Sequence, residues 1–141
     1  MILHLDDITH YNENSAGGSL YFSYADTFFP EEAWYDLVSV DLERWVPALI
    51  SFGANHSDMC NLEFMDGPYC IRLMRQENNS VVAKFYDSNK FIDQTEVDIL
   101  SFLASVTACC RKFDRSLYEN GFDPHFSEEI HSLKGILDRN I

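Results

Sequence analysis

Residues 59–75 read MCNLEFMDGPYCIRLMR, in which two alternating segments flank the pair Asp66-Gly67. An Asp-Gly pair favours the two-residue turn of a β-hairpin, because both positions of that turn take positive φ. If Met65 faces Pro68 across the turn, the apolar side chains of both segments share one face. The pairs in that register are Phe64 with Tyr69, Leu62 with Ile71 and Cys60 with Leu73. The sequence therefore predicts an antiparallel hairpin formed by residues 59–65 and 68–75.

Further strand patterns lie on both sides of this hairpin. The asparagine pair at 78–79 predicts a second turn, so a third strand over 80–87 continues the meander. Near the amino end, a short apolar segment at 2–5 predicts a strand, and the loop after it extends through the glycine pair at 17–18. Alternation of apolar and polar residues predicts another strand over 19–25.

The first expected helix begins at Pro30 and runs to about Phe52. Proline is tolerated in the first turn of a helix, and the acids that follow it favour the positive end of the helix dipole. Pro47 should bend or end this helix near residues 44–46, because it removes a backbone donor and clashes with the preceding turn. Helical spacing separates an apolar stripe from an acidic face. The stripe is Trp34, Val38, Leu42, Trp45 and Leu49, and the acids are Glu32, Asp36 and Glu43.

Two more helices are expected towards the carboxyl end. Residues 95–98 resemble a capping signal, and an apolar stripe then continues to Gly121, a residue type that favours helix ends. After Asp123-Pro124, Ser127 begins a shorter final helix. The order β-β-α-β-β-β-α-α predicts one α+β domain over residues 1–141. In it, an antiparallel sheet of four to five strands packs against two long helices and a shorter C-terminal helix.

The chain is strongly acidic, and the acidity is concentrated in its first half. Its net charge is −13, and residues 1–70 contain twelve acids but one base, Arg44, whereas residues 71–141 contain eleven acids and nine bases. A chain of this charge repels polyphosphates and anionic lipid surfaces, so we expect no nucleic acid and no membrane as partner. Concentrated negative charge favours a cation-rich protein partner, although a well-solvated acidic surface without a partner stays open.

The cysteines and histidines do not indicate a catalytic or metal site. The four cysteines, which include the neighbouring Cys109 and Cys110, lack CxxC spacing and favour reduced, buried thiols. The five histidines lack metal-ligand spacing, and only segment 56–60 brings possible ligands together. We therefore expect no catalytic residue, no metal and no cofactor, and a binding protein rather than an enzyme. Residues 1–7 lack a signal-peptide pattern, and no apolar stretch approaches the roughly 20 residues of a membrane helix, so we expect a cytoplasmic protein.

Asp41 is unusual because helical spacing places it within the tryptophan stripe, one turn before Trp45. A carboxyl group there would be shielded from water. One interpretation is an acid with a raised pKa in a pocket, or an anchor for an arginine of a partner. The other interpretation is a carboxylate that accepts hydrogen bonds from buried side-chain or backbone donors.

Three segments resemble a pattern found in small immunity proteins of bacterial polymorphic-toxin and contact-dependent growth inhibition systems. They are 29–36 (FPEEAWYD), 42–45 (LERW) and 62–69 (LEFMDGPY). The resemblance implies a protein without catalytic residues that binds a cognate toxin domain and occludes its active or substrate-binding surface. Such toxins are often nucleases, whose own surfaces are cationic, so the resemblance and the charge of the chain point to the same kind of partner.

The expected partner-binding surface is the outer, acidic face of the first helix, joined by acids from neighbouring loops and by exposed tyrosines as anchors. Its residues are Asp26, Glu32, Tyr35, Asp36, Glu43 and Asp66. A chaperone or adaptor for a secreted effector remains the alternative, and it would expose an apolar groove instead of a charged face. The oligomeric state stays open.

Overall fold

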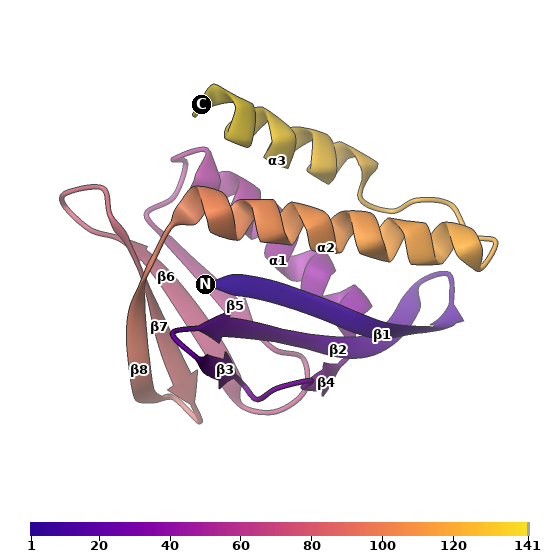
Figure 1. The fold of residues 1–141 in the computed structure, drawn as a ribbon, viewed down its shortest axis with the longest axis horizontal. Helices are drawn as coiled ribbons and strands as arrows, with labels where there is room; N and C mark the ends of the chain where they lie inside the picture. The colour runs from indigo at the N-terminus through magenta and orange to yellow at the C-terminus, as the bar shows by residue number, and fades with distance from the viewer. Residues whose placement is uncertain (141) are drawn as a thin grey trace.

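The computed structural model describes residues 1–140 and contains eight strands and three helices in that range (Figure 1). The strands are β1 (Ile2–Asn12), β2 (Ser15–Tyr24), β3 (Thr27–Phe29), β4 (Tyr35–Asp36), β5 (Met59–Glu63), β6 (Tyr69–Arg75), β7 (Val81–Asp87) and β8 (Lys90–Val97). The helices are α1 (Val38–Gly53), α2 (Ile99–Glu119) and α3 (Ser127–Arg139). All strand pairs are antiparallel, which confirms the predicted α+β class, but the strands divide between two four-stranded sheets.

The first sheet consists of β1 to β4, with β2 at its centre. β1 and β2 form a long hairpin that turns at residues 13–14, so the strand predicted at 2–5 continues to Asn12. The glycine pair at 17–18 lies inside β2 and not in the predicted loop. The half of β1 beyond the predicted residues 2–5 pairs with β2 through backbone hydrogen bonds. Backbone pairing does not require alternating apolar and polar side chains, so the sequence pattern does not reveal this half of the strand.

The second sheet is a meander in the order β5-β6-β7-β8. The predicted hairpin register is confirmed, because Leu62 pairs with Ile71 and Cys60 pairs with Leu73. The turn is wider than predicted: residues 64–68 connect the strands, and Gly67 takes positive φ (79°) whereas Asp66 does not. The sequence pattern missed β8, because seven of its eight side chains are exposed or half-buried and so show no alternation.

Helix α1 begins at Val38, so the prediction of a helix from Pro30 was wrong. Ala33 takes positive φ (58°), and the next residues form β4, where Tyr35 pairs with Ser19 of β2. Sheet pairing therefore replaces the helix that the local sequence favours. The helix continues through Pro47 to Gly53, which confirms the predicted end near Phe52, so of the bend or end predicted at residues 44–46 the end does not occur.

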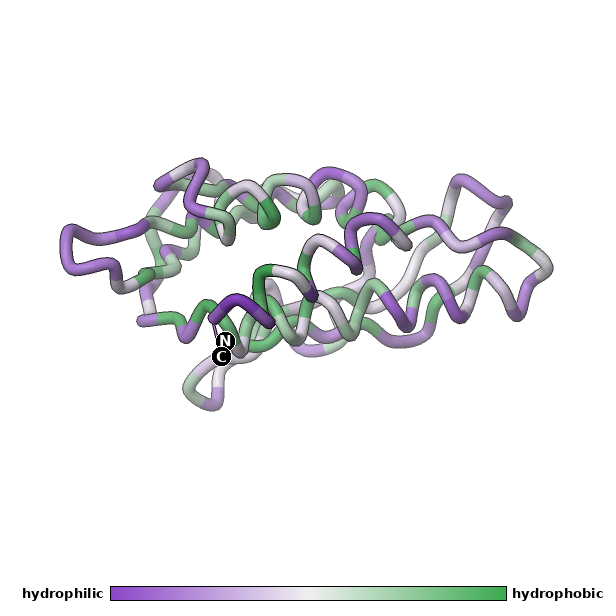
Figure 2. The backbone as a smooth tube through the Cα atoms, turned by 90° about the horizontal axis from the view of Figure 1, so that it is seen from above, coloured by the Kyte–Doolittle hydropathy of each residue, from purple (hydrophilic) through white to green (hydrophobic). Residues whose placement is uncertain are grey.

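The core joins both sheets to α1 through an aromatic cluster. The Trp45 ring centroid lies 5.6 Å from that of Phe22 in β2 and 4.9 Å from that of Phe64 beside β5. Trp45 Nε1 donates a 2.9 Å hydrogen bond to the Glu63 carbonyl, so the polar N–H of the buried indole has a hydrogen-bond partner. In Figure 2, hydrophobic positions follow the middle of the elements, whereas the loops at both ends are mainly hydrophilic.

Helix α2 packs along the free edge of β1, and α3 packs against α2 (Figure 1). The Leu3 N–H donates to Ser105 Oγ (3.0 Å), and the Cys109 thiol donates to the Leu3 carbonyl (3.4 Å). These contacts satisfy backbone groups that an edge strand otherwise exposes. Within residues 1–140, no helix has the length and apolar character needed to cross a membrane.

We expect Phe22→Ala to lower the free energy of unfolding by about 3–5 kcal/mol, because it leaves a cavity at the centre of the aromatic cluster. Urea denaturation followed by tryptophan fluorescence measures this change. The matched control is Tyr118→Ala, which truncates a ring that is 74% exposed and should change stability by less than about 0.5 kcal/mol. Equal effects of the two substitutions would contradict the position of the core.

Candidate partner-binding surface

Two buried aspartates meet where β4 leads into α1. Asp36 ends β4 and is 1% exposed, and Asp41 lies in the first turn of α1 and is 0% exposed. The Asp36 carboxylate accepts hydrogen bonds from Trp34 Nε1 (2.9 Å), from the Leu37 N–H (2.7 Å) and from the Asp66 N–H (3.2 Å). These donors replace the water that a buried carboxylate loses.

Asp41 is the member of the pair whose pKa is raised. Its Oδ1 accepts a 2.8 Å hydrogen bond from the Met65 N–H, whereas its Oδ2 has no N–H or side-chain donor among the described residues. Burial and the hydrogen bond to the neighbouring Asp36 carboxylate raise the pKa of Asp41 to about 9. The raised pKa favours the protonated form of Asp41 at neutral pH, which reduces the repulsion between the two buried carboxyl groups.

This aspartate pair determines where loop 64–68 lies. Met65 donates its N–H to Asp41, and Asp66 donates its N–H to Asp36, so two consecutive residues of the loop are held against β4 and α1. Asp41 thus accepts a buried backbone hydrogen bond, as the second interpretation predicts; its pKa is raised as in the first interpretation, but it lines neither of the two hollows described below.

Next to the pair is a hollow that we call the tyrosine hollow. It is lined by Tyr35, Asp36, Leu37, Met65 and Asp66. The Tyr35 and Met65 side chains, each 50% exposed, present apolar surface to solvent. Its volume of about 280 Å³ lies at the lower limit of small-molecule sites, which typically hold about 300–1,000 Å³, and suits a single side chain of a partner.

Tyr35 is positioned by a second tyrosine and by a glycine. Its hydroxyl is hydrogen-bonded to that of Tyr11, at the end of β1, which raises the pKa of Tyr35. Beneath both rings lies Gly17, where a Cβ atom would stand 2.2 Å from the Tyr35 hydroxyl and 2.8 Å from that of Tyr11. Gly17 therefore has a packing role: its missing side chain lets both tyrosines lie on β2.

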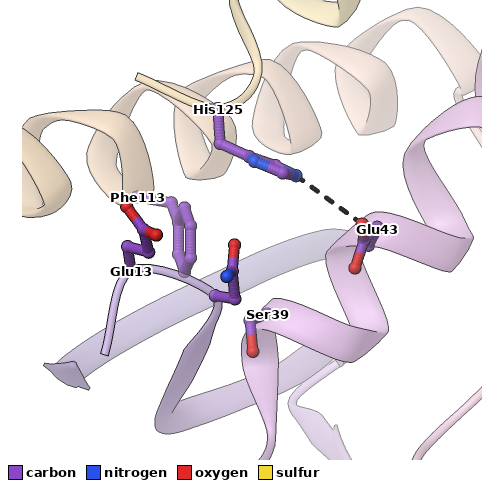
Figure 3. A pocket seen from close by; sticks show the side chains of 6 residues that line it. Glu13, Ser39, Glu43, Phe113 and His125 are labelled. Atoms are coloured by element: carbon purple, nitrogen blue, oxygen red, sulfur yellow. Dashed lines mark ion pairs between the residues drawn. The ribbon is translucent and has the colours of Figure 1, made fainter. Parts of the chain in front are cut away.

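A second concavity, which we call the histidine hollow, lies beside the first turns of α1 (Figure 3). It is lined by Glu13, Asn14, Ser39, Glu43, Phe113 and His125. His125 Nε2 lies 3.8 Å from Glu43 Oε1, and both side chains are largely exposed, so this ion pair contributes little stability. The loop that carries His125 is held by Asp114, whose Oδ1 accepts the His125 N–H (2.9 Å).

The structure brings together only part of the predicted surface. Tyr35, Asp36 and Asp66 meet at the tyrosine hollow, and Glu43 lies at the histidine hollow. The prediction of a helical acidic face was wrong, since Glu32 precedes β4 and Asp36 is buried. Asp26 lies apart, in the turn between β2 and β3. The sequence interpretation missed Tyr11, Glu13, Leu37, Met65 and His125, which reach this surface from distant segments and share no local motif.

The thiols and carboxylates do not form an alternative site in the part of the chain that the structure describes. No three His, Cys, Asp or Glu residues within residues 1–140 are placed to hold a metal ion. All four cysteines are free, and burial raises the pKa of Cys60 to about 11 and that of Cys109 to about 12. Thiols with such pKa values are poor nucleophiles at neutral pH.

Comparison with family models, with curated proteins and with solved structures gave no match to the chain.

The raised pKa of Asp41 predicts a pH-dependent stability. The unfolded chain releases this proton near pH 4 and the folded protein near pH 9, so folding stability falls as pH rises between these values. The free energy of unfolding should fall by up to about 1.4 kcal/mol per pH unit. In Asp41→Asn, the amide can still donate to Asp36 and accept from Met65, so the variant should lose this slope.

Urea denaturation of the wild type and Asp41→Asn at several values between about pH 5 and pH 8 measures the difference in slope. Asp123→Asn, which neutralises an exposed carboxylate, should keep the wild-type slope. Parallel slopes for the wild type and Asp41→Asn would mean that Asp41 holds no proton in the folded protein.

Proposed function

We propose that this protein binds a basic protein partner at the surface around the start of α1, and that it is an immunity protein for a toxin domain. We call this area the α1 surface. It comprises Tyr11, Glu13, Tyr35, Leu37, Glu43, Met65 and Asp66. The partner would be a cationic domain, most simply a nuclease, whose substrate-binding face the acidic protein covers. Neutralisation of such a toxin takes place in the cytoplasm.

The observation that carries the proposal is that exposed acids and exposed apolar side chains both lie in hollows at the start of α1. The described residues form three ion pairs: Arg75 with Asp58, Lys112 with Asp6 and His125 with Glu43. Glu13 and Asp66 are exposed and take part in none of these. Carboxylates without their own counter-charge raise the rate at which a cationic protein arrives.

Tyr35, Tyr11 and Met65 supply the apolar anchors that tight binding also requires. These side chains are 50%, 59% and 50% exposed, and tyrosine is among the residue types that contribute most to interface energies. Tyr35 is already held by Tyr11 and the flat surface over Gly17, so binding costs it little side-chain entropy. Together, the exposed acids would speed encounter with a cationic partner and the apolar anchors would slow its release.

Charge reversal tests the electrostatic part of the proposal. In Glu43→Lys/Asp66→Lys, association with the cognate toxin domain should slow by at least about tenfold at low salt, and the remaining rate should depend less on ionic strength. The matched control is Glu77→Lys/Glu96→Lys, which makes the same change in net charge at exposed positions of the second sheet.

Co-expression with the product of the neighbouring gene, scored by growth rescue and copurification, identifies the toxin domain for this measurement. Stopped-flow association at about 50 and 300 mM salt then gives the rates. Equal effects of the two double variants, or rates indifferent to salt, would contradict steering by the α1 surface and would favour the chaperone alternative.

Truncation of the anchor tests the apolar part. Tyr35→Ala should accelerate dissociation by about tenfold, which corresponds to about 1.4 kcal/mol of lost interface energy, with little change in association rate. Tyr118→Ala removes a ring from the exposed end of α2 and serves as the control. An unchanged dissociation rate in Tyr35→Ala would place the interface elsewhere.

A further inference from the structure

The second sheet has one face in the core and one face in solvent. Along β5, β6 and β7, buried residues alternate with residues that are exposed or half-buried. Strand pairing, continued into β8, arranges these solvent-facing residues in three rows across the sheet, and we call them the outer sheet face. The rows are Glu63, Cys70, Tyr86 and Phe91, then Asn61, Arg72, Lys84 and Gln94, and last Met59, Met74, Val82 and Glu96.

The middle row places two cations directly opposite each other. Arg72 of β6 pairs with Lys84 of β7, and the residues beyond them in the row, Asn61 and Gln94, are neutral. Like charges at directly opposite positions of an antiparallel pair destabilise it. The ion pairs formed among residues 1–140 include neither Arg72 nor Lys84. A chain with a net charge of −13 thus keeps an unneutralised positive row on this face.

The two cations also have hydrogen-bond donors that are not used within the protein. Arg72 Nε donates to Asn61 Oδ1 (3.0 Å), and Arg72 Cζ lies 5.3 Å from the centroid of the Tyr86 ring. These contacts hold the guanidinium group in place. Among residues 1–140, Arg72 Nε is the only side-chain nitrogen of Arg72 and Lys84 that donates a hydrogen bond. The terminal nitrogens of both side chains are therefore free to donate to a carboxylate from outside.

Apolar side chains border the positive row on both sides. In the row that ends at Glu96, Met59 is 47% exposed, and Met74 and Val82 are half-buried. In the row that begins at Glu63, Phe91 is 55% exposed, and Cys70 and Tyr86 are half-buried. The two acids stand at opposite corners of the face. Two donors between two apolar borders resemble the mixed polar and apolar surface of a protein interface.

We propose that the outer sheet face binds an acidic segment of a protein, with one carboxylate between Arg72 and Lys84 and apolar side chains on the bordering rows. This face shares no residue with the α1 surface.

A second copy of the chain does not fit as the occupant. In a two-fold symmetric contact centred on this face, each face meets itself, so Arg72 and Lys84 of both copies would lie together. A carboxylate from another protein removes the repulsion instead of doubling it. The overall charge of −13 does not prevent this contact, because charges more than about 8 Å away are largely screened at physiological ionic strength.

A nucleic-acid strand fits less well than an acidic protein segment. It carries one phosphate at every nucleotide, whereas the face offers two neighbouring cations, and Glu63 and Glu96 at its corners repel further phosphates. The apolar borders also need apolar partners, which an acidic protein segment supplies and a phosphate chain does not.

Methionine-methyl NMR with an acetylated and amidated peptide of alternating glutamate and leucine tests the proposal. The Met59 and Met74 signals should shift and saturate, with a dissociation constant on the order of 0.1 to a few millimolar. The Met65 signal, from loop 64–68, should stay unchanged. A peptide with glutamine in place of glutamate should give no saturable shift. Sodium chloride at matched concentrations corrects for ionic strength.

Lys84→Gln makes the test specific to the positive row, and it should weaken the acidic peptide by about fivefold or more. The variant removes a repulsion, so its free energy of unfolding should equal or exceed that of the wild type. The matched control is Lys134→Gln, which makes the same change in charge at an exposed position of α3 and should leave the affinity within about twofold. Equal losses in the two variants would mean that the peptide responds only to net charge and would overturn the proposal.

Three further results would also overturn it. One is the absence of a shift at Met59 and Met74 up to about 10 mM acidic peptide. Another is saturation by inorganic phosphate at equal or lower concentration, which would indicate a simple anion site. The third is tighter binding of a single-stranded oligonucleotide, which would indicate a nucleic-acid surface. The measurement uses this protein without a toxin domain, so its failure and a failure of toxin association at the α1 surface are separate results.

Discussion

Two buried carboxyl groups, those of Asp36 and Asp41, connect β4, α1 and loop 64–68, and the exposed surface at the start of α1 depends on them. Burying two aspartates is costly unless the charge is reduced and the oxygens are hydrogen-bonded. Both conditions are met here, because Asp41 is protonated and Asp36 accepts backbone and indole donors. The hydrogen bonds to loop 64–68 place Met65 and Asp66 beside Tyr35. A buried polar site thus sets the geometry of a surface that is itself exposed.

The distribution of charge explains why this surface stays negative in the folded protein. Most bases of the second half lie on α2 or on β6 to β8, whereas Glu13, Glu43 and Asp66 gather around the start of α1. Each exposed ion pair that does form contributes little stability. Uncompensated carboxylates repel one another and slightly destabilise the fold, and a cationic protein that covers them would remove this cost.

The start of α1 contributes to both hollows. The tyrosine hollow contains Leu37, the N-cap residue of α1, and the histidine hollow contains Ser39 and Glu43 of its first turns. Trp45, on the same helix, anchors it to both sheets through Phe22 and Phe64. A surface built on such an element needs little rearrangement on binding, which favours affinity.

The sequence alone determined the α+β class, the register of the hairpin around Gly67 and the long helix α2, because alternation and helical spacing are local properties that burial preserves. It also indicated that Asp41 is special, since a charged residue in an apolar stripe is costly. Only the tertiary structure decided that residues 30–37 form a loop and β4, because pairing with β2 outweighs local helix propensity. Likewise, the α1 surface joins side chains from β1, β4, α1 and loop 64–68, and no sequence spacing encodes contacts between segments so far apart.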